Sequence, residues 1–175
     1  MTYRPYALYT VAIVMSGPEP AIKPLNLTDV RERLGPVFSE AVQHHRPIPI
    51  IRGNRDLGML LGLEEIGRLV EAVSFQPEVF KEDRAVTIWL PEFQIFGRGS
   101  DLSAAREDLL EEVREYVATY LGEIDSYRSA PNRRAHFAHV IKALVADLSD
   151  RLEPAIFDNR ARAGTKEVIA ATNVR

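Results

Sequence analysis

The chain contains no cysteine among its 175 residues. It therefore forms no disulfide, and it offers neither a thiolate nucleophile nor a thiolate metal ligand. No apolar run comes near the roughly 18 residues that a membrane-spanning helix needs, so we expect no contact with a membrane. The absence of cysteine also fits a reducing compartment, and we expect a cytoplasmic protein.

The sequence also lacks the spacing of any catalytic or cofactor-binding motif. The segment 97–100, Gly-Arg-Gly-Ser, precedes an expected helix but has no lysine of a phosphate-binding loop. His136 and His139 are three residues apart and would share a helix face, but no third metal ligand stands at a suitable spacing. We therefore expect no enzyme activity, no catalytic residue, no cofactor and no metal. A metal-dependent enzyme that uses the two histidines is the less favoured alternative.

The net charge of −3 hides an uneven distribution. Residues 62–127 carry fifteen acidic and six basic side chains, a net charge of −9, whereas residues 128–175 carry nine basic and five acidic ones, a net charge of +4. An acidic segment is repelled by the phosphates of a nucleic acid. If the protein binds DNA, a terminal part of the chain must do so.

Hydrophobic periodicity predicts an α+β fold whose first domain spans residues 21–75. Its expected elements are a strand at 21–25, a helix at 27–44, a β-hairpin with strands at 47–52 and 57–61, and a helix at 63–74. Asn26 is the expected N-cap of the first helix, and Pro36 is expected to kink it. We expect residues 1–20 to be flexible or an upstream extension, because a turn-rich stretch separates them from this domain.

A second set of elements follows a linker that contains Pro77. Residues 84–123 are expected to form a hairpin and long-helix unit, and residues 130–175 a C-terminal helix with a basic tail. The expected elements are strands at 85–90 and 93–97, a helix from about 101 to 122 and a helix at 132–152. The long helix has a near-heptad apolar stripe, which predicts packing along another helix or a second copy. We expect residues 158–175 to be disordered.

Five arginines stand within 25 residues of the first domain, on the expected helix and hairpin. They are Arg31, Arg33, Arg46, Arg52 and Arg55. A lone exposed arginine is ordinary, but arginine binds guanine edges and phosphates with two parallel hydrogen bonds, which lysine does not. The group therefore indicates contact with nucleic acid.

The segment 26–66, NLTDVRERLGPVFSEAVQHHRPIPIIRGNRDLGMLLGLEEI, resembles the N-terminal domain of prevent-host-death (Phd/YefM-type) antitoxins. The resemblance covers residues 22–66. The residues in register are Asn26, Thr28, Arg31, Leu34, Pro47, Ile50, Ile51, Arg52, Leu60, Leu61, Leu63, Glu64 and Glu65. The hairpin tip departs from the family pattern, because glycine stands directly after Arg52.

The resemblance implies the antitoxin of a type II toxin–antitoxin system, which binds operator DNA as a homodimer, represses its own operon and neutralises a cognate toxin by binding it. The implied DNA-binding residues are Asn26, Thr28, Arg31, Arg33, Arg52 and Arg55. A toxin-binding role is implied further along the chain. The candidate toxin-binding residues are Phe137, Ile141, Leu144, Leu148 and Phe157.

The middle segment 87–113, TIWLPEFQIFGRGSDLSAAREDLLEEV, resembles the strand–Pro–strand–Gly–helix half of HicB-like antitoxins. This resemblance implies either a second dimerisation element or a docking surface for the toxin. An alternative for the whole chain is an interaction or scaffold protein that has the same fold but does not bind DNA. Salt-dependent binding to promoter DNA separates the two interpretations.

Overall fold

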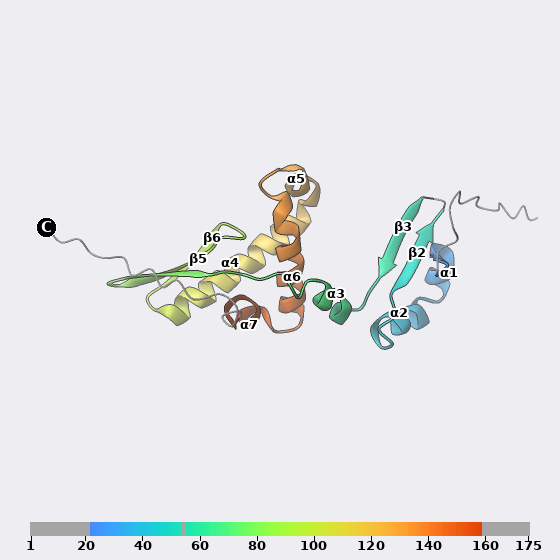
Figure 1. Cartoon of the computed structure of the whole chain (residues 1–175), viewed down its shortest axis with the longest axis horizontal. Helices are drawn as coiled ribbons and strands as arrows, with labels where there is room; N and C mark the ends of the chain where they lie inside the picture. Colours follow the sequence, from blue (N-terminus) through green and yellow to red (C-terminus); the bar gives the residue numbers. More distant parts are fainter. Residues whose placement is uncertain (1–21, 54, 159–175) are drawn as a thin grey trace, which may run out of the picture. The chain divides into compact units, whose positions relative to one another are not determined.

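The computed structural model describes residues 22–53 and 55–158, and it confirms the α+β fold class (Figure 1). The chain forms two compact units that divide between Gly62 and Leu63. The helix at 63–69 belongs to the second unit, whereas the sequence analysis grouped it with the first. The expectations for residues 1–20 and for the basic tail from 159 onward lie outside the described residues.

The first unit is a three-stranded sheet with two short helices. Its elements are β1 (Leu25–Asn26), α1 (Leu27–Glu32), α2 (Leu34–Val42), β2 (Ile48–Arg52) and β3 (Asp56–Leu60). The hairpin β2–β3 is antiparallel, as expected, but β1 pairs with β2 in parallel. The two helices between β1 and β2 make this possible, because a parallel pair needs a crossover connection.

The single helix expected at 27–44 is wrong, because the chain breaks at Arg33. Pro36 lies in the first turn of α2, where the missing N–H would have had no acceptor within the helix. The proline therefore stands at the start of a new helix and does not kink a longer one. Asn26 caps α1, as expected, and its side chain accepts a hydrogen bond from the backbone N–H of Thr28 at 2.9 Å.

The hairpin turn joins the last paired residues Arg52 and Asp56, and it includes Gly53 and Arg55. Gly53 has φ of 58°, a conformation that glycine adopts without steric cost. The glycine that departs from the family pattern therefore supplies the backbone conformation that this turn requires.

The second unit combines an antiparallel sheet with a layer of helices. Its elements are α3 (Leu63–Leu69), β4 (Glu78–Glu82), β5 (Ala85–Leu90), β6 (Ile95–Gly99), α4 (Leu102–Gly122), α5 (Ile124–Ser129), the 3-10 turn η1 (Arg134–His136), α6 (Phe137–Leu148) and α7 (Leu152–Phe157). The strand order is β4-β5-β6.

Three short elements of this unit, β4, α5 and α7, were not predicted from the sequence. The expected linker contains β4, because Val79 lies opposite Ile88 and extends the sheet. The expected loop before α6 contains α5, and the chain after α6 forms α7 with Pro154 in its first turn. These elements are too short to have a clear periodicity, and packing within the unit determines their structure.

The core of the second unit lies between the sheet and α4 (Figure 1). The buried face of β5 consists of Val86, Ile88 and Leu90, and α4 contributes Leu109 and Val113. Asp101 caps α4 by accepting a hydrogen bond from the backbone N–H of Ala104 at 3.0 Å. The helix partner expected for the apolar stripe of α4 is α6, which packs against it.

None of the helices in the described part of the chain combines the length and the apolar character needed to cross a bilayer.

Candidate functional site

The candidate DNA-binding residues at the start of α1 have different local roles. Asn26 uses its side-chain oxygen to cap the helix, whereas Thr28 is exposed in the first helical turn. Arg31 and Arg33 are exposed at the other end of α1, and neither forms an ion pair with another described residue. The two guanidinium groups are therefore available to an anion.

The arginines of the hairpin differ in their partners. Arg52 is bound by Asp56 at 2.6 Å, with both side chains exposed. Arg55 lies in the turn, is exposed, and has no ion pair within the described residues. An exposed ion pair contributes roughly 0–1 kcal/mol, so a phosphate can displace Asp56 from Arg52 at small cost.

The first unit buries little of its apolar surface. The hydrophobic residues that it buries are Val30, Val37 and Ala41. Leu34, Phe38 and Val42 are 59%, 54% and 37% exposed on one face of α2. On the strand β3, Leu57 and Met59 are 68% and 60% exposed, and they line an open hollow of about 430 Å³.

The candidate toxin-binding residues lie on α6 and α7 at different depths. Phe137 and Leu148 are 38% and 64% exposed, whereas Ile141 and Leu144 are half-buried. Phe157 is buried beneath the guanidinium of Arg106, 4.6 Å from the ring centre, and does not reach the surface.

A groove of about 180 Å³ lies between α4 and α6. Leu144 lines it together with Val117 and Leu121, and an ion pair of 2.9 Å between Arg114 and Asp147 joins the two helices. The groove gives the second unit an apolar recess beside the exposed Leu148.

His136 is the buried polar residue of the second unit. Its Nδ1 lies 2.6 Å from the hydroxyl oxygen of Tyr116, which accepts a hydrogen bond from the guanidinium of Arg133 at 3.2 Å. Burial lowers the pKa of His136, and the nearby charge of Arg133 lowers it further. Burial also raises the pKa of Tyr116. This arrangement fits a neutral His136 imidazole whose Nδ1 accepts a hydrogen bond from the Tyr116 hydroxyl.

His139, the second histidine of the possible metal pair, lies 3.1 Å from the backbone carbonyl of Ser74 through its Nε2. Both histidines therefore have structural partners. Among the described residues, no group of three metal-ligating side chains includes either of them.

Comparisons with known proteins identify the family to which the chain belongs. A family model described as "Antitoxin of toxin-antitoxin, RelE / RelB, TA system" (PHD_like) matches residues 22–156. The chain belongs to this antitoxin family. Antitoxins are not enzymes, and each has a cognate toxin as its partner.

A search of solved structures found a crystal structure described as an antitoxin part of a proposed toxin/antitoxin system from Syntrophomonas wolfei subsp. wolfei. Its TM-score is 0.66 at 24% sequence identity, and the match covers 78% of this chain and 97% of that chain. The similarity shows that the two proteins share a fold. A search of curated proteins found no significant match.

Sequence reasoning did not identify two features of the second unit. One is the network of Tyr116, His136 and Arg133, which joins residues from separate helical segments. The other is the sheet face that carries Trp89 and Phe96, because the pairing of β5 with β6 determines which side chains share it. The alternation of residues 85–90 gave the two faces of β5 but not their neighbours.

The lowered pKa of His136 predicts a pH-dependent stability. The unfolded chain takes up a proton on this histidine near pH 6.5, whereas the folded chain resists it, so the free energy of unfolding falls as the pH drops below about 6.5. Substitution His136→Gln retains an acceptor for Tyr116 but does not titrate, so its unfolding free energy changes less. Chemical denaturation at pH 7.5 and pH 5.5 measures the difference.

The exposed His44 is the control, and His44→Gln should follow the pH profile of the wild type. Burial raises the pKa of Glu92, and this makes the free energy of unfolding rise as the pH falls. The contribution is the same in the wild type, His136→Gln and His44→Gln, so it cancels in the comparison. Equal pH dependence of the wild type and His136→Gln would contradict the assigned role of His136.

Proposed function

We propose that this antitoxin binds operator DNA as a homodimer through its first unit, represses its own operon, and neutralises its toxin through the second unit. The first unit is then a DNA-binding domain of the Phd/YefM type. The observation that carries the proposal is a set of exposed guanidinium groups, Arg31, Arg33 and Arg55, without ion pairs among the described residues.

Electrostatics supports the assignment of DNA binding to the first unit. Residues 22–62 carry six basic and four acidic side chains, a net charge of +2. The residues that follow, 62–127, have a net charge of −9 and would be repelled by a duplex. Arginines on α1 and on the hairpin turn suit bidentate contacts with guanine edges and phosphates.

The small core supports the homodimer. In the described part of the first unit, residues 22–53 and 55–62, three hydrophobic side chains are buried, and a core this small usually needs a partner, a metal or a disulfide for stability. The chain has no cysteine, and the first unit leaves the α2 face of Leu34, Phe38 and Val42 exposed. A second copy that covers this face would complete the core.

The groove between α4 and α6 supports the toxin-binding role of the second unit. Phe137, Ile141, Leu144 and Leu148 follow one another at helical spacing, and Leu148 is the most exposed of them. An apolar side chain of the toxin that enters the groove would contact Leu144 and Leu148 together. Phe157 then acts as a core residue behind this surface.

The scaffold interpretation keeps one observation in its favour, the ion pair between Arg52 and Asp56. This ion pair offsets the positive charge of Arg52 at the hairpin tip. Measurement of DNA binding distinguishes this interpretation from the regulator.

Operator binding should depend on the arginines of α1 and β2. We expect Arg31→Ala and Arg52→Ala to weaken binding to DNA that carries the chain's own promoter, by about 1–3 kcal/mol for each arginine that reads a base. A band-shift titration at several salt concentrations measures the affinity. The control is Arg84→Ala, which removes the same charge from an exposed position of the second unit. Unchanged affinity in the two test variants would reject the regulator.

Dimerisation should depend on the exposed face of α2. We expect Phe38→Asp to raise the dimer dissociation constant at least tenfold, because a phenylalanine side chain contributes about 1.5–3 kcal/mol on burial. Light scattering over a concentration series measures the mass of the full chain. Gln43→Asp places the same charge at the end of α2 outside this face and should leave the mass unchanged. A wild type that is monomeric throughout the series would overturn the homodimer.

Toxin binding should depend on the apolar face of α6, where the exposed Leu148 lies one helical turn beyond the groove residue Leu144. We expect Leu148→Lys to weaken binding of the co-expressed cognate toxin at least tenfold, because a buried ammonium loses its hydration without gaining a partner. Co-purification and rescue of cell growth measure this. Thr119→Lys introduces the same charge on an exposed position of α4 that does not line the groove. Equal toxin binding by both variants would place the toxin elsewhere.

A further inference from the structure

The sheet of the second unit has one face against which none of the helices in the described residues 63–158 packs extensively. The side chains of Val86, Ile88 and Leu90 point from β5 into the core against α4, so Thr87 and Trp89 belong to the opposite face. The sheet packs extensively against α4 alone, and α4 occupies the core face. We call the opposite side, which carries Thr87 and Trp89, the outer face.

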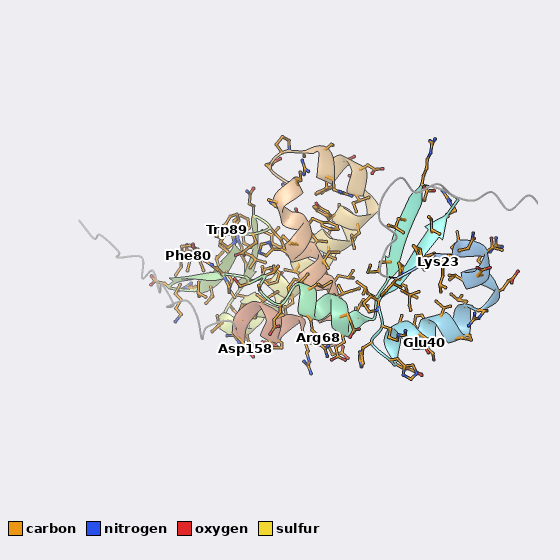
Figure 2. The ribbon with its side chains drawn as sticks, turned by 45° about the vertical axis from the view of Figure 1, so that its right-hand side comes forward. Lys23, Glu40, Arg68, Phe80, Trp89 and Asp158 are labelled. Atoms are coloured by element: carbon orange, nitrogen blue, oxygen red, sulfur yellow. The ribbon has the colours of Figure 1, made fainter. Side chains whose placement is uncertain are left out.

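Strand register defines which aromatic residues share the outer face. Phe96 of β6 lies opposite Trp89, and Phe80 of β4 lies opposite Thr87. The rings of Trp89 and Phe96 are in contact, with centres 4.8 Å apart, and Phe96 is 48% exposed. Figure 2 labels Phe80 and Trp89 among the side chains of this sheet. The middle of the outer face is therefore aromatic and accessible.

The charges of the outer face are separated between its two edges. Arg98 stands on β6, opposite Thr87, with its guanidinium 5.4 Å from the centre of the Phe96 ring. Glu78 and Glu82 stand on β4, opposite Trp89 and Ala85. None of the three charged groups forms an ion pair with another described residue. Arg98 thus gives the β6 edge of the outer face a positive charge, and Glu78 and Glu82 give its β4 edge a negative charge.

This separation makes the outer face complementary to itself. If two copies meet face to face about a two-fold axis parallel to the strands, β4 of each copy lies over β6 of the other. The row of Arg98 falls between the rows of Glu78 and Glu82, each about 7 Å away along the strand. Each guanidinium then meets the carboxylates of the other copy, and the aromatic centres cover one another. Such an interface is isologous, so both charge contacts occur twice.

We propose that the outer face of the second unit is a self-association surface whose occupant is the same face of a second copy. The face measures roughly 14 by 17 Å, from three strands about 4.8 Å apart and five residues of about 3.4 Å each. This is well below the roughly 800 Å² per partner of a standard interface, so the contact is weak. Contact between outer faces adds one association step to the homodimer that we propose for the first unit. Because the contact is weak, it forms only where the local concentration of the protein is high.

Charge reversal tests the symmetry of the contact. Sedimentation velocity of the full chain over a concentration series should show an assembly step that Arg98→Glu removes. The double variant Glu78→Arg, Glu82→Arg should also lose it, because like charges then face each other. An equimolar mixture of the two variants should regain the step, since the reversed edge of one copy meets the reversed edge of the other. Phe96→Ser should weaken the step in an otherwise wild-type chain.

Glu112→Arg on the exposed side of α4 is the matched control and should assemble as the wild type does. Absence of the step in the wild type, its persistence in Arg98→Glu, or failure of the mixture to regain it would overturn the proposal. Loss of toxin binding in Arg98→Glu and Phe96→Ser at unchanged mass would assign the face to the toxin instead. At protein concentrations below the assembly step, all these variants should bind operator DNA with the same affinity. A loss of DNA binding is therefore distinguished from a loss of assembly.

Discussion

The close approach of α4 to β6 determines the architecture of the second unit. A side chain at Gly97 would bring its Cβ within 2.5 Å of the Leu109 Cβ, and one at Gly99 within 2.6 Å of the Ala104 Cβ. Two glycines on the same face of β6 therefore allow the helix to lie against the strand backbone. The carboxylate of Asp108 accepts a hydrogen bond from the Arg98 N–H at 2.8 Å and fixes the register of helix and strand. With α4 held on one face, the aromatic residues of the other remain exposed, and the remaining side of α4 receives α6.

The first unit depends on an opposite condition, which is an incomplete core. Its three buried hydrophobic residues cannot offset the conformational entropy of about 40 ordered residues, at roughly 1–2 kcal/mol for each backbone. The apolar side chains that could complete the core are exposed on α2 and β3. Folding and association are therefore expected to be linked in this unit, so that its stability depends on protein concentration. The DNA-binding surface proposed for this unit would then be fully formed only in the associated state.

Local signals in the sequence were sufficient for the fold class, the hairpin around Gly53, the strand Ala85–Leu90 and the long helix from about residue 101 to 122. Each of these depends on residues close in the chain. The strand β4 was missed because its pairing with β5 outweighs a weak local preference. The break at Arg33 was missed because Pro36 was interpreted as a kink within one helix, whereas it lies in the first turn of a second helix. For the candidate sites, the sequence indicated the exposed arginines but not the Asp56 that binds Arg52. Nor could helical periodicity distinguish Leu148, which is exposed, from Phe157, which is buried, because that difference depends on where Arg106 of α4 lies.

The division of charge separates the partners of the two units. Several basic residues of the second unit are occupied within it, since Arg106 pairs with Glu153 at 3.5 Å and Arg114 with Asp147 at 2.9 Å. The acidic residues of α4 remain exposed, among them Glu111 and Glu115, so this unit repels DNA and favours cationic protein partners. The candidate DNA-binding residues belong to the first unit, and the candidate toxin-binding residues belong to the second. If the proposed contact between second units forms, it raises the local concentration of the first units, and this would link assembly to the proposed binding of operator DNA.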